Sequence, residues 1–362
     1  MAPRNTFLPH FATVGMIDRE TYAGRVERLA GKGPFLASKP ENMVYLSGTD
    51  AGFMMLVTGE GDALLLVSRM EAERAGRESW VSEMIAFQRG KVPLRDGEMC
   101  RFGSAAMVLG EVLEERGIDG LRHDGLPGKV ASELSSVKLE SSSEIEEMRA
   151  IKTPAEIELI EEARRVIGDV YEEVSSELAG DMSELAVAGM IVSSIMSRDV
   201  ESSFDPIVAF DENSALPHGK PGRKRLSGAR TMLFDIGAKV EGYCSDITRT
   251  VVETPRAMEE LEVVKGAIED VADALEVGMR LEDADAVARE SLGDNATLMI
   301  HGLGHGLGLA VHEGPVLAAG SEDVLRDGMV FTIEPGIYHA GKYGIRWEDD
   351  YLCRNGRVGP VL

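Results

Sequence analysis

Short apolar runs separated by turn-forming residues are typical of the first third of the chain. The runs predicted to be β-strands lie at residues 34–38, 43–47, 53–57 and 63–67. Apolar residues recur with the spacing of amphipathic helices at residues 18–30, 70–79 and 104–115. This alternation predicts an α/β domain with a mixed sheet over residues 1–140.

A polar segment at residues 139–143 ends this pattern and predicts a linker over residues 141–152. A strong helix start follows: Thr153 as N-cap, Pro154 at the first helical position and Glu156 completing a capping box. The helix is expected to reach about residue 178. Residues 153–362 form the second predicted domain, and all candidate chemistry lies within it.

Two aspartates lie in apolar segments that flank a short turn. Asp235 and Asp246 belong to predicted strands on either side of residues 239–242, and the two plausible hairpin registers pair Asp235 with position 246 or 248. Both registers place the two carboxylates on one face, because side chains alternate along a strand. Burying an unpaired carboxylate in an apolar strand is unfavourable in free energy, so the pattern favours a cation bound between the two aspartates.

A second pair of carboxylates repeats this arrangement. Glu334 and Glu348 lie in predicted strands around a turn near Gly341 and can face each other across that hairpin. Arg346, two residues before Glu348, shares its face. Four acidic groups on two hairpins predict a site for one or two divalent cations.

Histidines add nitrogen donors to this set. His305 and His312 lie in a glycine-dense segment, residues 301–313, where the backbone can approach other strands closely. Imidazole joins carboxylates at Mn, Co and Zn centres. His218 lies in a loop just before the first metal strand.

These motifs resemble the pita-bread metallopeptidases, in the branch of prolidase and aminopeptidase P. The resemblance rests on Asp-Ile-Gly-Ala, Ser-Asp-Ile-Thr-Arg-Thr, Gly-His-Gly-Leu-Gly, Thr-Ile-Glu-Pro-Gly and Ile-Arg-Trp-Glu-Asp, in that order over residues 150–362. The first 140 residues, with Tyr-Leu-Ser-Gly at 45–48, resemble the amino-terminal domain of that branch more weakly, which argues against a simple methionine aminopeptidase. The expected fold is α/β (α+β): a creatinase-like N-terminal domain with a mixed sheet, followed by a pita-bread domain.

The resemblance implies a pair of divalent cations, Mn²⁺ first and Co²⁺ or Zn²⁺ as alternatives. Asp246 and Glu348 would bridge them, Asp235 would complete one centre, and His305 and Glu334 would complete the other. Such cations lower the pKa of a bridging water and polarise a carbonyl. The remaining roles implied are Glu334 as proton carrier, His218 and His312 as substrate contacts and catalytic donors, and Arg346 as a substrate-binding or supporting residue.

The implied reaction is hydrolysis of Xaa-Pro bonds, most readily in dipeptides, as in a prolidase. The close alternative is an aminopeptidase P that acts on longer Xaa-Pro peptides. A non-catalytic binding protein and a metal-free creatinase-type hydrolase are weaker alternatives, because all five ligand positions hold ligand-type residues. The expected partners are short proline-containing peptides and a second copy of the chain in a homodimer.

Three residues beside these motifs have open interpretations. For His301 a structural or supporting role and a direct role in the site are equally open, and Thr248, on the same face as Asp246, is a candidate supporting residue of the metal site. Cys244 would share that face too if the strand is regular, and a packed thiol is favoured over a ligand.

The amino-acid composition excludes further classes of protein. The net charge of −24 argues against phosphate-mediated binding of nucleic acid, and it is compatible with either a salty cytoplasm or ordinary acidic composition. No apolar run is long enough to predict a membrane span or a signal peptide. Three scattered cysteines do not suggest a disulfide framework, so a reducing cytoplasm is expected.

Overall fold

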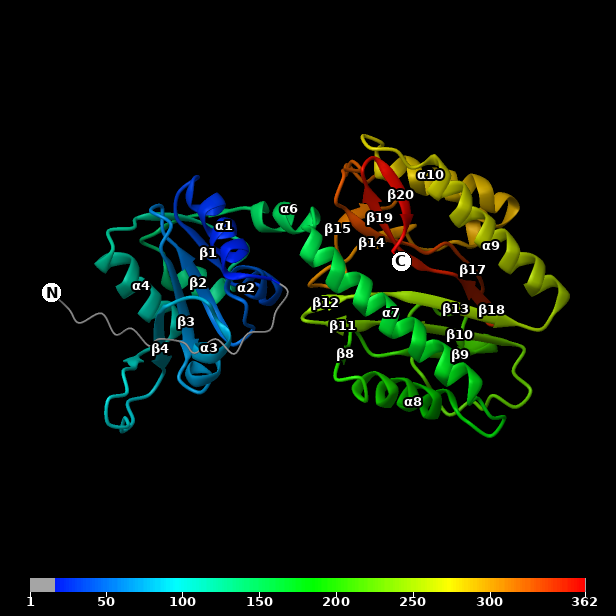
Figure 1. Ribbon diagram of the computed structural model, residues 1–362, viewed down its shortest axis with the longest axis horizontal. Helices are drawn as coiled ribbons and strands as arrows, with labels where there is room; N and C mark the ends of the chain where they lie inside the picture. The colour runs from blue at the N-terminus through cyan, green and yellow to red at the C-terminus, as the bar shows by residue number, and fades with distance from the viewer. Residues whose placement is uncertain (1–16, 362) are drawn as a thin grey trace. The chain divides into compact units, whose positions relative to one another are not determined.

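The chain folds into two compact units, residues 1–149 and residues 150–362, in a computed structural model that describes residues 17–361 (Figure 1). In the described residues the first unit has one sheet and one buried apolar cluster, whereas the second has several sheets and two such clusters. Among the described residues, no helix combines the length and the apolar content that a bilayer crossing requires. The domain limits expected from the sequence stay a prediction.

The first unit is built on a seven-stranded sheet with the strand order β5-β4-β3-β2-β1-β6-β7. The strands are β1 (Phe35–Ala37), β2 (Gly52–Val57), β3 (Ala63–Ser68), β4 (Glu83–Gln88), β5 (Arg101–Phe102), β6 (Gly120–His123) and β7 (Lys138–Ser141). β2 is antiparallel to β1 and β3, whereas the other neighbours are parallel. The predicted mixed sheet is therefore confirmed.

Helices complete the first unit. They are α1 (Arg19–Ala30), α2 (Pro40–Ser47), α3 (Ala72–Glu78), α4 (Ala105–Glu115), α5 (Gly128–Glu133) and α6 (Glu144–Ala150). α4 begins where the Ser104 side chain accepts a hydrogen bond from the backbone N–H of Met107. Its buried face, with Leu109 and Leu113, packs on Leu36 and Leu64 of the sheet.

The prediction of a strand at residues 43–47 was wrong, because these residues belong to helix α2. Pro40 occupies the first turn of α2, and Gly48 ends it in the left-handed conformation with φ of 77°. A short, mainly apolar run fits a buried strand as well as a buried helical turn. Pro40 and Gly48, which flank this run at the positions where helices start and stop, are the signal that distinguishes the helix from a strand.

The second unit contains the remaining elements. Its helices are α7 (Pro154–Ser176), α8 (Glu184–Met196), α9 (Pro255–Ala274) and α10 (Leu281–Leu292), with 3-10 turns η1 (Asp211–Asn213) and η2 (Gly293–Leu298). Its strands are β8 (Glu201–Ser202), β9 (Ile207–Phe210), β10 (Thr231–Ile236), β11 (Ala238–Val240), β12 (Tyr243–Cys244), β13 (Ile247–Val252), β14 (Gly304–Gly306), β15 (Glu313–Leu317), β16 (Val330–Ile333), β17 (Gly336–His339), β18 (Tyr343–Arg346), β19 (Asp349–Arg354) and β20 (Arg357–Pro360).

α7 begins as the sequence predicts. The Thr153 hydroxyl and the Glu156 carboxylate form the reciprocal capping box, with Pro154 at the first position. The apolar face of α7, with Ile167 and Val170, packs together with α8 on Phe210 and Phe234 of β9 and β10.

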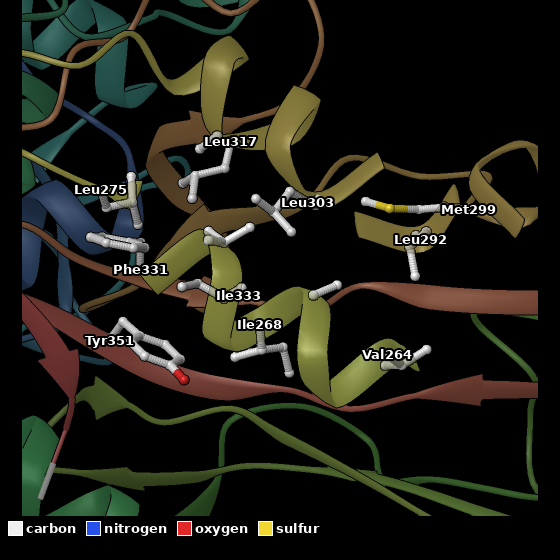
Figure 2. Packing of buried hydrophobic residues seen from close by; sticks show 14 of the residues in the cluster. Val264, Ile268, Leu275, Leu292, Met299, Leu303, Leu317, Phe331, Ile333 and Tyr351 are labelled. Atoms are coloured by element: carbon white, nitrogen blue, oxygen red, sulfur yellow. The ribbon is translucent and has the colours of Figure 1, made fainter. Parts of the chain in front are cut away.

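The other helix pair, α9 and α10, packs on the sheet of order β15-β14-β16-β19-β20. Figure 2 shows Phe331 and Ile333 of β16 close to Ile268 of α9, with Leu303 nearby. All four side chains are buried, so this cluster holds the strand that leads to Glu334. The candidate site thus lies on strands whose other faces are covered by helices.

Candidate active site

The first hairpin pairs Asp235 with Thr248 in an antiparallel ladder between β10 and β13. Of the two registers left open by the sequence, this is the second. Asp246 lies just before β13, at a break between β12 and β13. Gly237 permits that break, because a Cβ there would lie 2.2 Å from the carbonyl oxygen of Ser245. Asp235 and Asp246 nonetheless line the same pocket.

This break also explains the position of Cys244. The prediction that Cys244 shares the face of Asp246 depended on a regular strand, and the strand is interrupted between the two residues. The thiol is fully buried, and it lies 3.9 Å from the carbonyl oxygen of Leu309. Cys244 does not line the pocket within the described part of the chain, as the packed-thiol interpretation expects.

The second hairpin brings Glu334 opposite Glu348. Ile333 pairs with Asp349 and Gly336 with Arg346, so the register on either side of the two glutamates is continuous. The backbone N–H of Glu348 donates to the carbonyl oxygen of Thr248 at 3.2 Å. This bond joins the two hairpins edge to edge and brings their carboxylates together.

His305 reaches the carboxylates from β14, between two glycines. A Cβ at Gly304 would lie 2.1 Å from the Thr332 carbonyl oxygen, and a Cβ at Gly306 would lie 2.1 Å from that of Gly314. Only glycine therefore allows β14 to lie between its neighbours. The His305 Nε2 atom is 3.5 Å from a Glu334 carboxylate oxygen and 3.9 Å from one of Asp246.

A single pocket of about 500 Å³ collects every site residue expected from the sequence. These residues are His218, Asp235, Asp246, His305, His312, Glu334, Arg346 and Glu348. His301 lines it too. Sequence reasoning missed the apolar part of the wall, formed by Phe204, Ile207, Pro217, Val316 and Ala318.

The donor set fits divalent cations. Asp246, His305 and Glu348 each offer a ligand atom, and these atoms all lie within 4.8 Å of one another. One carboxylate oxygen each of Asp235, Asp246 and Glu348 is buried without a hydrogen-bond partner. Buried unpaired carboxylate oxygens are expensive, and cations shared between them would remove that cost.

The carboxylates hold their protons more tightly than usual. Burial raises the pKa of Asp246 well above its ordinary value, and Glu348 and Asp235 raise it further. Burial, followed by Asp235, raises the pKa of Glu348 to about 7. Burial also raises the pKa of Glu334, with Glu348 adding to the effect. Burial lowers the pKa of His305 to about 4, so its imidazole is neutral and can act as a ligand.

These shifts predict how the metal-free protein responds to pH. The pKa of Glu348 is about 7 in the folded chain and 4.5 ordinarily, so its contribution to stability is complete below pH 4.5 and is lost as pH rises through 7. We expect a lower Tm at pH 8 than at pH 5.5 by calorimetry, and a rise of about 5–10 °C when a divalent cation is added at pH 8.

The matched control is Glu348→Gln, which removes this titration. The pH dependence of its Tm should be flatter, and its response to the cation should be weaker. A wild-type Tm that ignores both pH and the cation would contradict a metal site of raised-pKa carboxylates.

Arg346 is buried, with 3% of its surface exposed, and its guanidinium forms hydrogen bonds with residues around the site. It donates to Asp235 at 2.6 Å, to the Thr248 hydroxyl at 2.9 Å and to the Tyr338 hydroxyl at 2.8 Å. The Thr248 hydroxyl in turn donates to Glu348 at 2.7 Å. These contacts favour the supporting interpretation of Arg346, and they connect Thr248 to Glu348 rather than to Asp246.

The other pocket histidines differ in their surroundings. The rings of His305 and His312 meet edge to face with centroids 4.2 Å apart, and burial, then His218, lowers the pKa of His312. His301 shares hydrogen bonds with the Tyr338 hydroxyl at 2.9 Å and with the Gly302 carbonyl at 2.7 Å. Through Tyr338 it therefore supports Arg346. His339 bonds to Glu260 away from the pocket, and His10 lies outside the described residues.

Asp350 was not found by sequence reasoning. Its side chain is fully buried, and its carboxylate accepts the backbone N–H of Asp246 at 3.2 Å. Burial raises its pKa well above the ordinary value. Its place two residues after Glu348 was the only available signal, and acidic residues are too common in this chain for that position to stand out.

The two-unit fold, with carboxylates and histidines converging in one pocket, is that of a metal-dependent hydrolase. The chain belongs to Metallopeptidase family M24, whose model matches residues 158–355, while the Creatinase/Prolidase N-terminal domain matches residues 32–151. The expected pita-bread and creatinase-type domains are thereby confirmed. The family membership supports an enzyme over a non-catalytic binding protein.

Relatives of known name are similar over most of the chain. The Xaa-Pro dipeptidase of Pyrococcus furiosus is 34% identical over 325 residues, which cover 87% of this chain and 89% of the relative. The structure of the Xaa-Pro dipeptidase from Bacillus anthracis matches with a TM-score of 0.83 at 26% identity, covering 95% of this chain and 97% of that one. The X-Pro aminopeptidase of Thermotoga maritima matches with a TM-score of 0.78 at 29% identity, covering 93% and 97%.

Proposed function

We propose that this protein hydrolyses Xaa-Pro bonds in short peptides with a pair of divalent cations, with dipeptides as the first substrates. The observation that carries the proposal is the convergence of Asp235, Asp246, His305, Glu334 and Glu348 in one pocket. Buried carboxylate oxygens without partners on three of these residues support a role as ligands. The Xaa-Pro dipeptidase of Pyrococcus furiosus, similar over 87% of this chain, supports the substrate class.

As the sequence suggests, Asp246 and Glu348 would be shared by the two cations, Asp235 would complete one centre, and His305 and Glu334 would complete the other. Cations held there would supply Lewis-acid polarisation of the scissile carbonyl and would make a water molecule acidic enough to attack near neutral pH. Glu334 takes the proton from the attacking water and returns it to the leaving nitrogen. Its position near His305, with 16% of its side chain exposed to the pocket, supports that role.

His218 and His312 contact the substrate and donate hydrogen bonds to its carbonyl oxygens or its carboxylate. Both line the pocket. Arg346 holds Asp235 in place and opposes the burial that raises the pKa of Asp235, because removing the guanidinium would leave a buried carboxylate unpaired. A tertiary Xaa-Pro amide has no N–H. In the proposed binding mode the pocket contacts the oxygen atoms of the substrate, so a substrate with proline loses no hydrogen bond for lack of that N–H.

A substrate panel tests the proposal. With Mn²⁺ added, Ala-Pro should be cleaved at a rate at least about tenfold above Ala-Ala, one tenfold step being about 1.4 kcal/mol of transition-state discrimination. An Xaa-Pro peptide of three or more residues separates the two activities, since a prolidase prefers the dipeptide and an aminopeptidase P the longer chain. Equal cleavage of proline and non-proline peptides, or none with any metal, would contradict the substrate assignment.

Several finer assignments belong to the same proposal. Mn²⁺ is the proposed metal, with Co²⁺ and Zn²⁺ as alternatives that metal analysis of the purified protein decides. We propose a homodimer in the cytoplasm, to be checked by light scattering and by cell fractionation. Residues 1–140, 141–152 and 153–362 are the proposed N-terminal domain, linker and catalytic domain.

A further inference from the structure

His218 reaches the pocket from a loop, residues 211–222, that follows strand β9. The side chain of His218 is exposed at the pocket wall, and its ring forms no hydrogen bond with another residue in the described range 17–361. Its place is therefore set by the backbone of the loop. Whatever holds this backbone decides where the imidazole can donate to a substrate.

Glu184, the first residue of α8, lies beneath this loop with 1% of its surface exposed. One carboxylate oxygen accepts the backbone N–H of Phe210 at 2.7 Å. The other accepts the backbone N–H of Gly222 at 2.7 Å and the side-chain amide of Asn213 at 3.1 Å. The three donors come from the residue before the loop, from its last residue and from its first turn, so one buried carboxylate holds both ends.

Asn213 extends this attachment into the loop. Its side-chain amide also donates to the Lys220 carbonyl at 3.1 Å, and its own carbonyl accepts the N–H of Leu216 at 3.1 Å. Gly219 lies against it so closely that a Cβ would meet the Asn213 carbonyl oxygen at 2.8 Å. The residues on both sides of His218 therefore contact Asn213, and Asn213 is hydrogen-bonded to Glu184.

The opposite side of the loop is held by β18. The backbone N–H of Gly344 donates to the Ser214 hydroxyl at 2.8 Å, and the Arg346 guanidinium donates to the Pro217 carbonyl at 3.3 Å. The loop is fixed on this side by the strand that leads to Glu348. On the other side the loop is held by Glu184 and, at its first residue, by Asp211, whose carboxylate accepts the backbone N–H groups of Arg230 and Thr231.

We propose that Glu184 is a positioning residue for His218: it closes the loop so that the imidazole meets the substrate next to the metal ligands. The inference rests on the role of His218 in the proposed function. Glu184 does not line the pocket among the described residues, so its effect on turnover passes through the loop.

Two variants test this in the metal-loaded, full-length protein. Glu184→Gln keeps the shape but puts an N–H donor against backbone N–H groups, and Asn213→Ala loosens the loop while Glu184 keeps two partners. We expect each to lower kcat/KM on Ala-Pro by about tenfold to a hundredfold, because small misplacements of substrate-contacting groups cost that much. Metal content should stay at the wild-type level. If Glu184→Gln fails to fold, the kcat/KM of Asn213→Ala alone tests the proposal.

A double-mutant cycle separates positioning from general destabilisation. In a His218→Ala background, Glu184→Gln should change kcat/KM less than twofold, because the group it positions is already gone. Glu260→Gln, another buried glutamate that contacts no pocket residue, is the matched control and should retain activity. Three results would each overturn the proposal. They are a Glu184→Gln loss of kcat/KM that is as large in the His218→Ala background as in the wild type, a His218→Ala variant with wild-type kcat/KM, and full activity in both loop variants.

Amide exchange provides a readout that does not need turnover. In Glu184→Gln the N–H groups of Phe210 and Gly222 should exchange at least about tenfold faster, while amides of α9 keep their wild-type rates. Absence of Xaa-Pro cleavage by the wild-type protein would reject the proposed function, and exchange would still report on the loop. Unchanged exchange at both amides would reject the attachment to Glu184.

Discussion

Asp246→Asn should lose its bound metal and lower kcat/KM on Ala-Pro by at least about a thousandfold, which corresponds to several kcal/mol of transition-state stabilisation. The carboxamide has nearly the same shape but carries no charge, and Asp246 contributes ligand atoms within 4.8 Å of those of His305 and Glu348. The folded structure should survive, because replacing one of several mutually repelling carboxylates relieves repulsion in the metal-free site.

The measurements are metal content of the purified variant, steady-state kinetics and circular dichroism. Asp285→Asn is the matched control: Asp285 is equally buried, but its carboxylate bonds to Arg289 in α10. It should keep its metal. An Asp246→Asn variant with full metal content and full activity would overturn the ligand assignment.

Glu334→Gln should lower kcat by about a hundredfold to ten-thousandfold with a smaller change in KM, the range expected for a lost general base. The amide cannot accept the proton of the attacking water, although its oxygen can still face His305. The pH profile of the residual activity should also lose the limb that reports proton transfer by Glu334. Wild-type kcat in this variant would assign the proton transfer to another group.

A paired measurement keeps these two effects apart. Glu334→Gln should retain more metal than Asp246→Asn, because Asp246 is proposed to be shared by both cations and Glu334 holds only one. Equal and complete metal loss in both variants would show that the Glu334 effect comes from the metal and would leave proton transfer unassigned to it.

The chemistry of this protein could be predicted from its sequence because it lies in short, unusual motifs. A carboxylate inside an apolar strand is expensive, so Asp235 in Met-Leu-Phe-Asp-Ile is informative on its own. The alternation of side chains then placed Asp246 on the same side in either register. The sequence left two pairings of Asp235 open; the observed one is with Thr248, and local pattern does not reveal the break before β13 that accompanies it.

Other parts needed three-dimensional contacts. Phe204, Ile207 and Val316 line the pocket, but apolar residues are found throughout this chain and none signals a wall. Residues 43–47 were predicted to be a strand because a short apolar run fits either period, and the signal for α2 lies in Pro40 and Gly48 at its two ends. The hydrogen bonds of Glu184 to Phe210 and Gly222 span 26 and 38 residues of sequence, so only the folded chain reveals that attachment.

The central claim is that five side chains from distant segments hold a pair of cations. Crystals of the protein loaded with Mn²⁺, measured near the manganese absorption edge, test it most directly. The account predicts two anomalous peaks about 3.5–4 Å apart, lying between Asp235, Asp246, His305, Glu334 and Glu348. Peaks elsewhere, or no peak in a protein that cleaves Xaa-Pro peptides, would contradict it.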